Sequence, residues 1–365
     1  MVAQNLNQAS REWATRPDDQ RFLSLDELYA SVSERKGESW TATPRLADLR
    51  ALPTDGNGLE LEVYDPTQGR RRTLTPTNWS FNQLAQNAKA PASYLRTLPA
   101  ELAAINLQWG FEHGSDRDDS LVLARSNGTN ELRAMTSTSY GRIWDVDVVK
   151  GVQKANEGDR WHVPAASYST TNPRRATTLY ASDRDVFIFL VDEKNPIEHK
   201  GETLFRGFIT WNSEVGAATF GLTTFLYRYV CDNRIIWGAT DVSELKIRHT
   251  SGAPERFAYE GAKFLRRYAE ESTAGVVAQI EAAQNAVIPL NKGKGDTVEG
   301  WLAARGFTRG QAKAAVESAR AEEGQSESVW NIVNGITAYA RSIPHTDERV
   351  RLETQAGKLL DAVTK

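Results

Sequence analysis

The chain has 365 residues, 40% of them hydrophobic and 25% charged, with a formal net charge of -3. These values are ordinary for a soluble globular protein and exclude a chain that is disordered throughout. The slightly acidic balance excludes a basic surface over the whole molecule, so nucleic-acid binding would need a local basic stripe. No apolar run approaches the roughly 20 residues that cross a bilayer, and we expect no membrane association.

The single cysteine, Cys231, excludes an intrachain disulfide and a zinc site built from several thiolates. The first 21 residues are polar and lack the apolar core of a secretory signal. We therefore expect a protein of a reducing, cytoplasmic environment.

The first part of the chain, residues 1–106, is predicted to contain short helices and one β-hairpin. Ser24 followed by two acids is typical of a helix N-terminus. Residues 59–64 alternate apolar and polar side chains, and an Asp-Pro-Thr-Gln-Gly turn leads to a partner strand at 70–74. Helices are expected to follow at residues 79–85, 92–97 and 100–106.

The second part, residues 107–253, is predicted to be a β-rich core domain, because it is rich in the aromatic and β-branched residues that favour strands. A helix with two acids in its first turn is expected at residues 145–152. The expected strands are residues 107–112, 120–125, 131–136, 186–191, 203–212, 219–229 and 245–249.

The third part, residues 254–365, is predicted to be a helical region. Apolar residues recur at helical spacing over an unusually long run, residues 255–286. After a flexible linker at 289–297, helices are expected at residues 298–305, 309–321, 328–340 and 347–363. The sequence therefore predicts an α+β protein with a central antiparallel β-sheet framed by helices and an all-helical C-terminal region.

A polar corner between two predicted strands is the most informative segment. Asn212, Ser213 and Glu214 lie directly beside apolar strand residues and precede Gly216. Such residues satisfy the hydrogen bonds of a turn without any ligand, and Glu214 would then cap a backbone amine or pair with an arginine. Alternatively, Asn212 and Glu214 face a groove and form a functional site.

Arginines interleaved with aromatic residues are the second signal. Guanidinium groups bind phosphates in a bidentate manner, and aromatic rings stack on unpaired bases, so one sheet face carrying both would suit a single nucleic-acid strand. Alternatively, the rings belong to the core and the arginines pair with acids such as Asp145 and Glu214. The candidate nucleic-acid-binding residues are Arg142, Arg174, Arg175, Arg206, Arg228 and Arg248.

Motifs for other chemistry are weak. A lone cysteine after an apolar strand, such as Cys231, is usually a small buried hydrophobe. The five histidines show no metal-ligand spacing, and Gly293-Lys294-Gly295 lacks the spacing of a phosphate-binding loop. We therefore predict no catalytic residue, no metal site and no cofactor.

Several segments occur together in a characteristic order. They include residues 11–22, which begin Arg-Glu-Trp-Ala-Thr-Arg-Pro, residues 206–216, which end Trp-Asn-Ser-Glu-Val-Gly, and residues 330–337, which begin Trp-Asn-Ile-Val-Asn-Gly, with further pieces at 90–99, 228–233 and 247–250. In these segments the chain resembles the phage/plasmid-like protein family catalogued as domain of unknown function 932. The resemblance spans nearly the whole chain and implies a mobile-element setting in a prokaryote, with a host-cytoplasmic location if a phage encodes the protein.

The leading hypothesis from the sequence is a non-enzymatic protein that binds single-stranded DNA in phage or plasmid replication or recombination, with strand annealing as one such role, and that forms homo-oligomers. One alternative is a metal-dependent nuclease or nucleotide-modifying enzyme centred on Glu214, with Asn212, Asp232 and His249. Another is an interaction protein that blocks a host defence factor.

Overall fold

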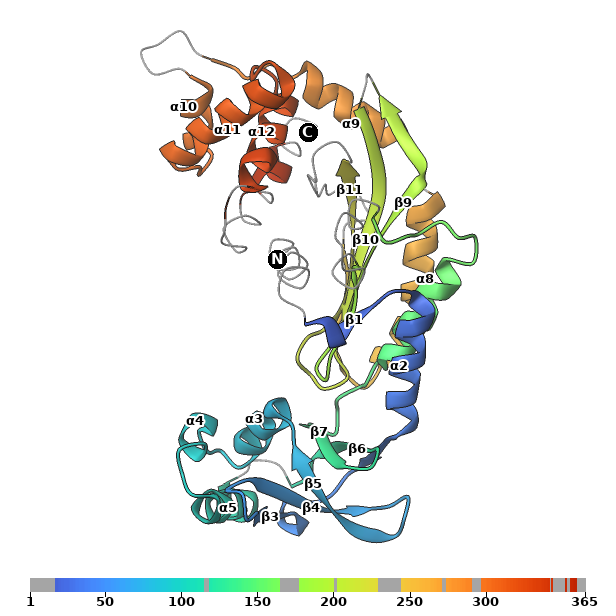
Figure 1. Ribbon diagram of the computed structural model, residues 1–365, viewed down its shortest axis with the longest axis vertical. Coiled ribbons are helices and arrows are strands. Elements are labelled where there is room, and N and C mark those ends of the chain that lie inside the picture. The colour runs from blue at the N-terminus through green and yellow to red at the C-terminus, as the bar shows by residue number, and fades with distance from the viewer. Residues whose placement is uncertain are drawn as a thin grey trace.

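The computed structural model describes residues 17–114, 118–164, 177–199, 202–228, 244–270, 274–290, 297–341, 343, 352 and 355–359. Within these residues the chain forms two six-stranded β-sheets with helices around them (Figure 1). The predicted α+β class is confirmed. The structure differs from the expected single central sheet, because the strands predicted at 120–125 and 131–136 join the predicted hairpin and two short N-terminal strands in a second sheet.

This N-terminal sheet has the strand order β2-β6-β7-β5-β4-β3. All its neighbouring strands are antiparallel except β5 and β7, which pair in parallel. Helices α3, α4 and α5 lie beside it (Figure 1), and we call the sheet with these helices the N-terminal lobe. The strands are β2 (Ser39–Ala42), β3 (Arg50–Pro53), β4 (Leu59–Asp65), β5 (Arg70–Pro76), β6 (Leu121–Ser126) and β7 (Asn130–Thr136), and the helices are α3 (Asn78–Asn87), α4 (Ala92–Leu95) and α5 (Ala100–Trp109).

The strand predicted at residues 107–112 was wrong. Helix α5 continues to Trp109, and a π-helical turn, η3 (Gly110–Gly114), follows it. Ala103, Leu107 and Phe111 are all buried in the core of the N-terminal lobe. This spacing of four residues places them on one face of a helix, and it outweighs the strand-like composition of the segment.

The edge of the N-terminal sheet is covered by a side chain of α5. Gln108 accepts a hydrogen bond from the backbone N–H of Ala51 and donates one to the carbonyl of Leu49. Both atoms belong to the outer edge at β3, where main-chain groups otherwise lack a neighbouring strand. One amide side chain therefore satisfies a donor and an acceptor of this edge.

The second sheet, here called the curled sheet, is a half-barrel with the strand order β1-β8-β9-β10-β11-β12. Each neighbouring pair is antiparallel. The long strands β9 and β10 continue beyond the segments expected from the sequence. The strands are β1 (Arg21–Phe22), β8 (Leu179–Ala181), β9 (Val186–His199), β10 (Glu202–Asn212), β11 (Phe220–Arg228) and β12 (Glu244–Ile247).

Helices α2 (Leu25–Gly37), α6 (Asp145–Ala155) and α8 (Ala253–Glu270) cover one face of the curled sheet (Figure 1). Ile188, Leu190 and Phe208 on this face share a buried core with apolar residues of the three helices. Helix α2 begins as predicted, because the Ser24 hydroxyl accepts a hydrogen bond from the N–H of Glu27. The predicted helical run 255–286 contains α8, described to Glu270, and α9 (Ala274–Asn285).

The opposite face of the curled sheet is aromatic. Alternate residues of β8, β9 and β10 form a second buried cluster on it, which contains Tyr180, Phe187, Phe189, Phe205 and Trp211. A β-carbon at Gly221 would collide with the indole of Trp211, so this glycine gives the large ring its place on the neighbouring strand. The alternation of side chains along the strands therefore builds two separate cores, one on each face.

The C-terminal helices pack on the far end of the β9–β10 hairpin. Ile197 and Leu204 from that hairpin share one core with α9 to α12. The described elements after β12 are all helical, in agreement with the prediction for this region. They include α10 (Val298–Ala303), α11 (Arg309–Glu323) and α12 (Val329–Arg341). Among the described residues, no helix is both long enough and apolar enough to cross a bilayer.

Candidate functional site

The polar corner at the end of β10 lies where the N-terminal lobe meets the curled sheet. Its side chains belong to a buried polar group that we call the junction cluster. Three arginines, two carboxylates and one amide come from α2, β7, the loop before α6, the start of α6 and the corner itself. The cluster consists of Arg35, Arg133, Arg142, Asp145, Asn212 and Glu214, each of which is buried.

Glu214 is held on both of its carboxylate oxygens. One oxygen accepts a hydrogen bond from the backbone N–H of Asp145, the first residue of α6, at 2.9 Å. The other lies 2.8 Å from a guanidinium nitrogen of Arg133 and 3.7 Å from Nε of Arg35. Glu214 therefore both caps a backbone amine and pairs with arginines, as the turn hypothesis expected. A carboxylate also suits the positive end of a helix dipole.

The carboxylate of Asp145 makes two short polar contacts. A guanidinium nitrogen of Arg35 lies 2.6 Å from one carboxylate oxygen, and the amide nitrogen of Asn212 donates to the other at 2.7 Å. Asn212 also donates to the carbonyl of Ile143 at 2.8 Å. Arg35 thus lies between two acids, and Asn212 connects the end of β10 to the start of α6.

The pKa values of the two buried acids are shifted in opposite directions, upward for Asp145 and downward for Glu214. Burial raises the pKa of Asp145 to about 8, and the neighbouring Glu214 charge adds to this rise. Burial alone would raise the pKa of Glu214 as well, but Arg35 and Arg133 outweigh it and lower that pKa. The negative charge of the pair is therefore held more firmly on Glu214, which faces two guanidinium groups.

Arg142 and its neighbours close the cluster on another side. The Arg142 guanidinium donates to the carbonyl of Glu214 and lies 5.5 Å from the centre of the Tyr140 ring. Burial lowers the pKa of Arg142 to about 10. Tyr140 stacks on His249 and donates from its hydroxyl to the carbonyl of Ser213, and burial lowers the pKa of His249.

The corner also connects the two sheets through hydrogen bonds. The carbonyl of Val215 accepts hydrogen bonds from the indole of Trp79 at 2.9 Å and the amide of Gln83 at 2.8 Å. Both donors are on α3 of the N-terminal lobe. The Ser213 hydroxyl donates to the carbonyl of Arg184 and accepts from the N–H of Ala217, so it fixes the turn itself. The junction cluster therefore joins the two parts of the molecule through side chains that are buried.

The arginines that the sequence suggested for nucleic-acid binding lie in different surroundings. Arg142 is buried in the junction cluster, and Arg206 is buried with its guanidinium 5.7 Å from the ring centre of Tyr268 on α8. Arg248 is exposed directly after β12. Arg174, Arg175 and the side chain of Arg228 lie outside the described residues, as do Cys231 and Asp232. The three described side chains do not share one face.

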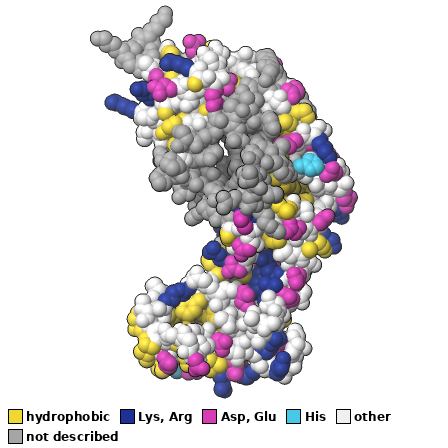
Figure 2. All heavy atoms as spheres, viewed as in Figure 1, with side chains coloured by type: hydrophobic (Ala, Val, Ile, Leu, Met, Phe, Trp, Pro, Cys, Tyr) yellow, Lys and Arg dark blue, Asp and Glu magenta, His cyan; other side chains and the backbone are white. Residues whose placement is uncertain are grey.

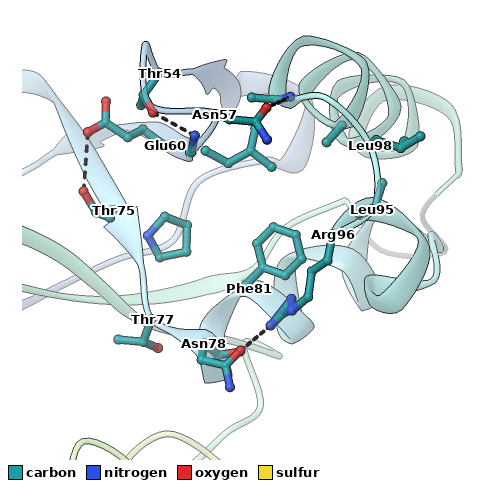
Figure 3. Close-up of a pocket in the computed structure, with 15 residues that line it drawn as sticks. Thr54, Asn57, Glu60, Thr75, Thr77, Asn78, Phe81, Leu95, Arg96 and Leu98 are labelled. Atoms are coloured by element: carbon teal, nitrogen blue, oxygen red, sulfur yellow. Dashed lines mark hydrogen bonds between the residues drawn. The ribbon is translucent and has the colours of Figure 1, made fainter.

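An open pocket in the N-terminal lobe was not anticipated from the sequence. It has a volume of about 530 Å³ and lies between the β3–β4 turn, the start of α3 and helices α4 and α5 (Figure 3). At its edge the guanidinium of Arg96 lies 4.2 Å from the ring centre of Phe81. Figure 2 shows an apolar hollow on this lobe with basic side chains along one edge. Arg96 and Phe81 are separated by 15 positions with no shared pattern, so only the tertiary fold reveals the pair.

Among the residues that the structure describes, no group of three or more histidine, cysteine, aspartate or glutamate side chains is arranged to hold a metal ion.

The fold and the site define an α+β protein whose two sheets are joined through a buried ion cluster. The model of the family described as "Domain of unknown function (DUF932)" matches residues 171–358, just over half of the chain, and the chain belongs to this family. The matched part contains β8 to β12 and the corner at Asn212–Glu214, whereas the pocket beside Arg96 lies outside it. No curated protein and no solved structure matches the chain.

Proposed function

We propose that the protein is a non-enzymatic binding protein for single-stranded nucleic acid, acting in replication or recombination of a phage or plasmid, with strand annealing as one such role. The observation that carries the proposal is the exposed Arg96 guanidinium stacked on Phe81 at the mouth of the open pocket. A guanidinium attracts phosphate, and a ring beside it offers a surface for an unpaired base.

Unlike the buried arginines, Arg96 keeps part of its guanidinium accessible to a phosphate while it packs on Phe81. Arg142 and Arg206 are 8% and 4% exposed, and a phosphate cannot reach either without displacing protein atoms. Arg96 is exposed, and the contacts that orient it use one face of the guanidinium and one of its nitrogens. The described residues therefore favour the N-terminal lobe over Arg142 and Arg206 as a place where a strand binds.

The test is fluorescence anisotropy with a labelled 30-nucleotide single strand at two salt concentrations. Binding at low salt that weakens steeply as salt rises is the expected result, because bound phosphates release counterions. A duplex of the same sequence serves as the control and should bind less well, since its bases are not available for stacking. Absence of binding to the single strand at low salt would refute the proposal.

The enzymatic alternative centred on Glu214 has less support from the geometry. Both carboxylate oxygens of Glu214 are already occupied by Arg133, Arg35 and the N–H of Asp145, and the side chain is 1% exposed. Metal-assisted cleavage would require a carboxylate that is free to hold the ion beside a substrate. Cleavage of a labelled oligonucleotide with magnesium or manganese that is lost in Glu214→Ala would favour the enzyme instead.

A protein-interaction role has one observation in its favour. Leu102, Ile105 and Trp109 are 49%, 63% and 65% exposed and lie on one face of α5 at a spacing of three and four residues. An apolar stripe of this kind is typical of protein contacts, and it supports our proposal that the chain forms homo-oligomers. Light scattering of the purified chain tests this. A monomeric wild-type protein would refute self-association. An oligomer whose mass does not change in Ile105→Ser and Trp109→Ser variants would refute self-association through α5.

A further inference from the structure

The pocket of the N-terminal lobe has a polar group at each of two ends and apolar walls between them (Figure 3). Its volume of about 530 Å³ lies within the range of sites that bind small molecules. The walls are supplied by β4, β5, α3, α4 and α5. The apolar lining includes Leu59, Pro76, Phe81, Leu95, Leu98 and Ala103.

The first polar end is the guanidinium of Arg96. One of its terminal nitrogens donates to both the carbonyl and the side-chain oxygen of Asn78, and the plane of the group lies over Phe81 (Figure 3). Among the described residues, the structure gives Nε and the other terminal nitrogen no partner. The side chain is therefore held in place while part of its donor set faces solvent. An anion that binds there needs little further ordering of the arginine.

The second polar end is the amide of Asn57 in the β3–β4 turn. Its backbone is left-handed, with φ of 57°, and its side-chain oxygen accepts a hydrogen bond from the N–H of Ala100 at 2.7 Å. A backbone N–H can only donate, so this bond decides which amide atom is the oxygen. The amide nitrogen is directed toward the space above Phe81 (Figure 3). A ligand thus meets a hydrogen-bond donor opposite Arg96.

The one carboxylate in the lining selects the orientation of an anionic ligand. Glu60 and Arg96 lie on opposite sides of the pocket in Figure 3, and Glu60 accepts a hydrogen bond from the Thr75 hydroxyl at 3.4 Å. A negatively charged group is therefore repelled at the Glu60 side and attracted at the Arg96 side. The matching ligand has a flat, largely apolar body with hydrogen-bond acceptors and an anionic group at one end.

We propose that this pocket receives one nucleotide of a single strand, with the base against Phe81 and Pro76, a base acceptor at the Asn57 amide and the phosphate on Arg96. The inference rests on the proposed function and assigns a site to it. Stacking on a ring tolerates any base, so the pocket binds the strand with little sequence preference. The neighbouring nucleotides continue outward from the open mouth.

The experiment compares the wild-type protein with Arg96→Ala, Arg96→Lys, Phe81→Leu and Asn57→Ala in anisotropy titrations with fluorescein-labelled oligothymidylate of 30 nucleotides. Arg71→Ala is the matched control, because Arg71 is also a partly exposed arginine of the same lobe but pairs with Glu62 away from the pocket. Melting temperatures establish that each variant is folded. Arg96→Ala and Phe81→Leu are each expected to weaken binding about tenfold, and Arg71→Ala less than twofold.

The outcomes separate the site from the function. Loss of affinity in the pocket variants but not in Arg71→Ala supports the site. Unchanged affinity in the pocket variants, with tight binding by the wild type, overturns the site and leaves the proposed function standing. Failure of the wild type to bind at low salt overturns both. The wild type could instead bind a peptide that contains phenylalanine and glutamate, lose that binding in Arg96→Ala, and not bind the oligonucleotide. That result would make the pocket a peptide site and would overturn the proposal.

A second readout locates the base directly. Oligothymidylate with one 5-iodouracil is irradiated on the protein, and the cross-linked peptide is identified by mass spectrometry. An adduct on the segment that contains Phe81 is expected and should disappear in Phe81→Leu. An adduct found only on segments remote from the pocket would overturn the proposal.

Discussion

Replacing Glu214 with glutamine is the sharpest test of the junction cluster. The substitution keeps the shape of the side chain and an acceptor for the N–H of Asp145, but it removes the negative charge and turns the oxygen beside Arg133 and Arg35 into an amide nitrogen. It leaves the guanidinium of Arg133, 2% exposed, without its ion-pair partner. Breaking a buried ion pair by removing one partner costs about 3–5 kcal/mol. Because the Glu214 charge raises the pKa of Asp145, its removal also lets Asp145 ionise more readily beside Arg35, so we expect a loss of about 3 kcal/mol, at the lower end of this range.

Glu62 provides a matched control on the surface. It lies 3.0 Å from Arg71 and 3.8 Å from Arg50, nearly the distances that separate Glu214 from its two arginines. The Glu62 side chain is 25% exposed and its partners 43% and 67% exposed. Exposed pairs of this kind contribute about 0–1 kcal/mol, so Glu62→Gln should lower the free energy of unfolding by less than about 1 kcal/mol. The contrast isolates burial, since the residue types and distances agree.

The assay is urea unfolding at pH 7, followed by tryptophan fluorescence, with the free energy of unfolding extrapolated to water. Repeating it in 1 M NaCl adds a second criterion, because salt screens the exposed pair and leaves the buried pair nearly unaffected. Equal losses in Glu214→Gln and Glu62→Gln, within about 1 kcal/mol, would contradict the argument that burial gives the junction cluster its strength.

Four further predictions concern two glycines, Asp145 of the junction cluster and the sheet edge at Gln108. Gly151→Ala should stabilise the protein by about 0.5–1 kcal/mol, because Gly151 is inside α6 and a β-carbon there would lie 3.6 Å from Phe257, in ordinary contact. Gly335→Ala should instead lower the melting temperature, since its β-carbon would lie under 3.0 Å from the backbone N of Ala319 and closer still to the carbonyl of Ala315. Melting temperatures of the two variants that equal that of the wild type would contradict both predictions. The free energy of unfolding should fall as pH rises from 7 to 8, by up to about 1.4 kcal/mol per pH unit, because a raised carboxyl pKa means that folded Asp145 holds a proton which the unfolded chain has lost. Arg35, Arg133, Asn212 and Glu214 surround that carboxyl, and a slope that persists in Asp145→Asn would assign it to another group. Gln108→Ala should cost about 1–2 kcal/mol in urea unfolding by leaving the N–H of Ala51 and the carbonyl of Leu49 without their partner. Gln108→Glu should cost at least as much, because its carboxylate would face the carbonyl of Leu49 and the carboxylate of Glu112 where the amide now donates.

The elements that the sequence predicted well are those stabilised by local interactions. Ser24 caps α2 through its own hydroxyl, and the turn before Arg70 joins β4 and β5 as expected. The short strands β2 and β3 were missed, since four residues carry too little alternation to indicate a strand. They exist because β6 and β4 supply hydrogen-bonding partners from elsewhere in the chain. The expected domain boundaries near residues 106 and 253 stay predictions.

The candidate site residues show the same difference between what local interactions and what long-range contacts determine. The sequence pointed to Asn212, Ser213 and Glu214, and it offered Arg142 both as a ligand for phosphate and as a partner for acids. The structure places Arg142 on the carbonyl of Glu214 and gives Glu214 two other arginines, from α2 and β7. Nothing in the local pattern distinguishes a buried guanidinium from an exposed one. The pocket was likewise invisible, because Asn57, Phe81 and Arg96 come from a turn and two separate helical segments.

The sequence by itself determined the class of the protein, its family and the positions of its main helices and long strands, because side-chain periodicity, caps and turns act over a few residues. Only the tertiary structure decided which charges are buried, which arginines remain accessible and where a cavity opens. These properties depend on contacts between segments that are far apart in the chain, and burial changes the energy of a charge far more than its neighbours in sequence do.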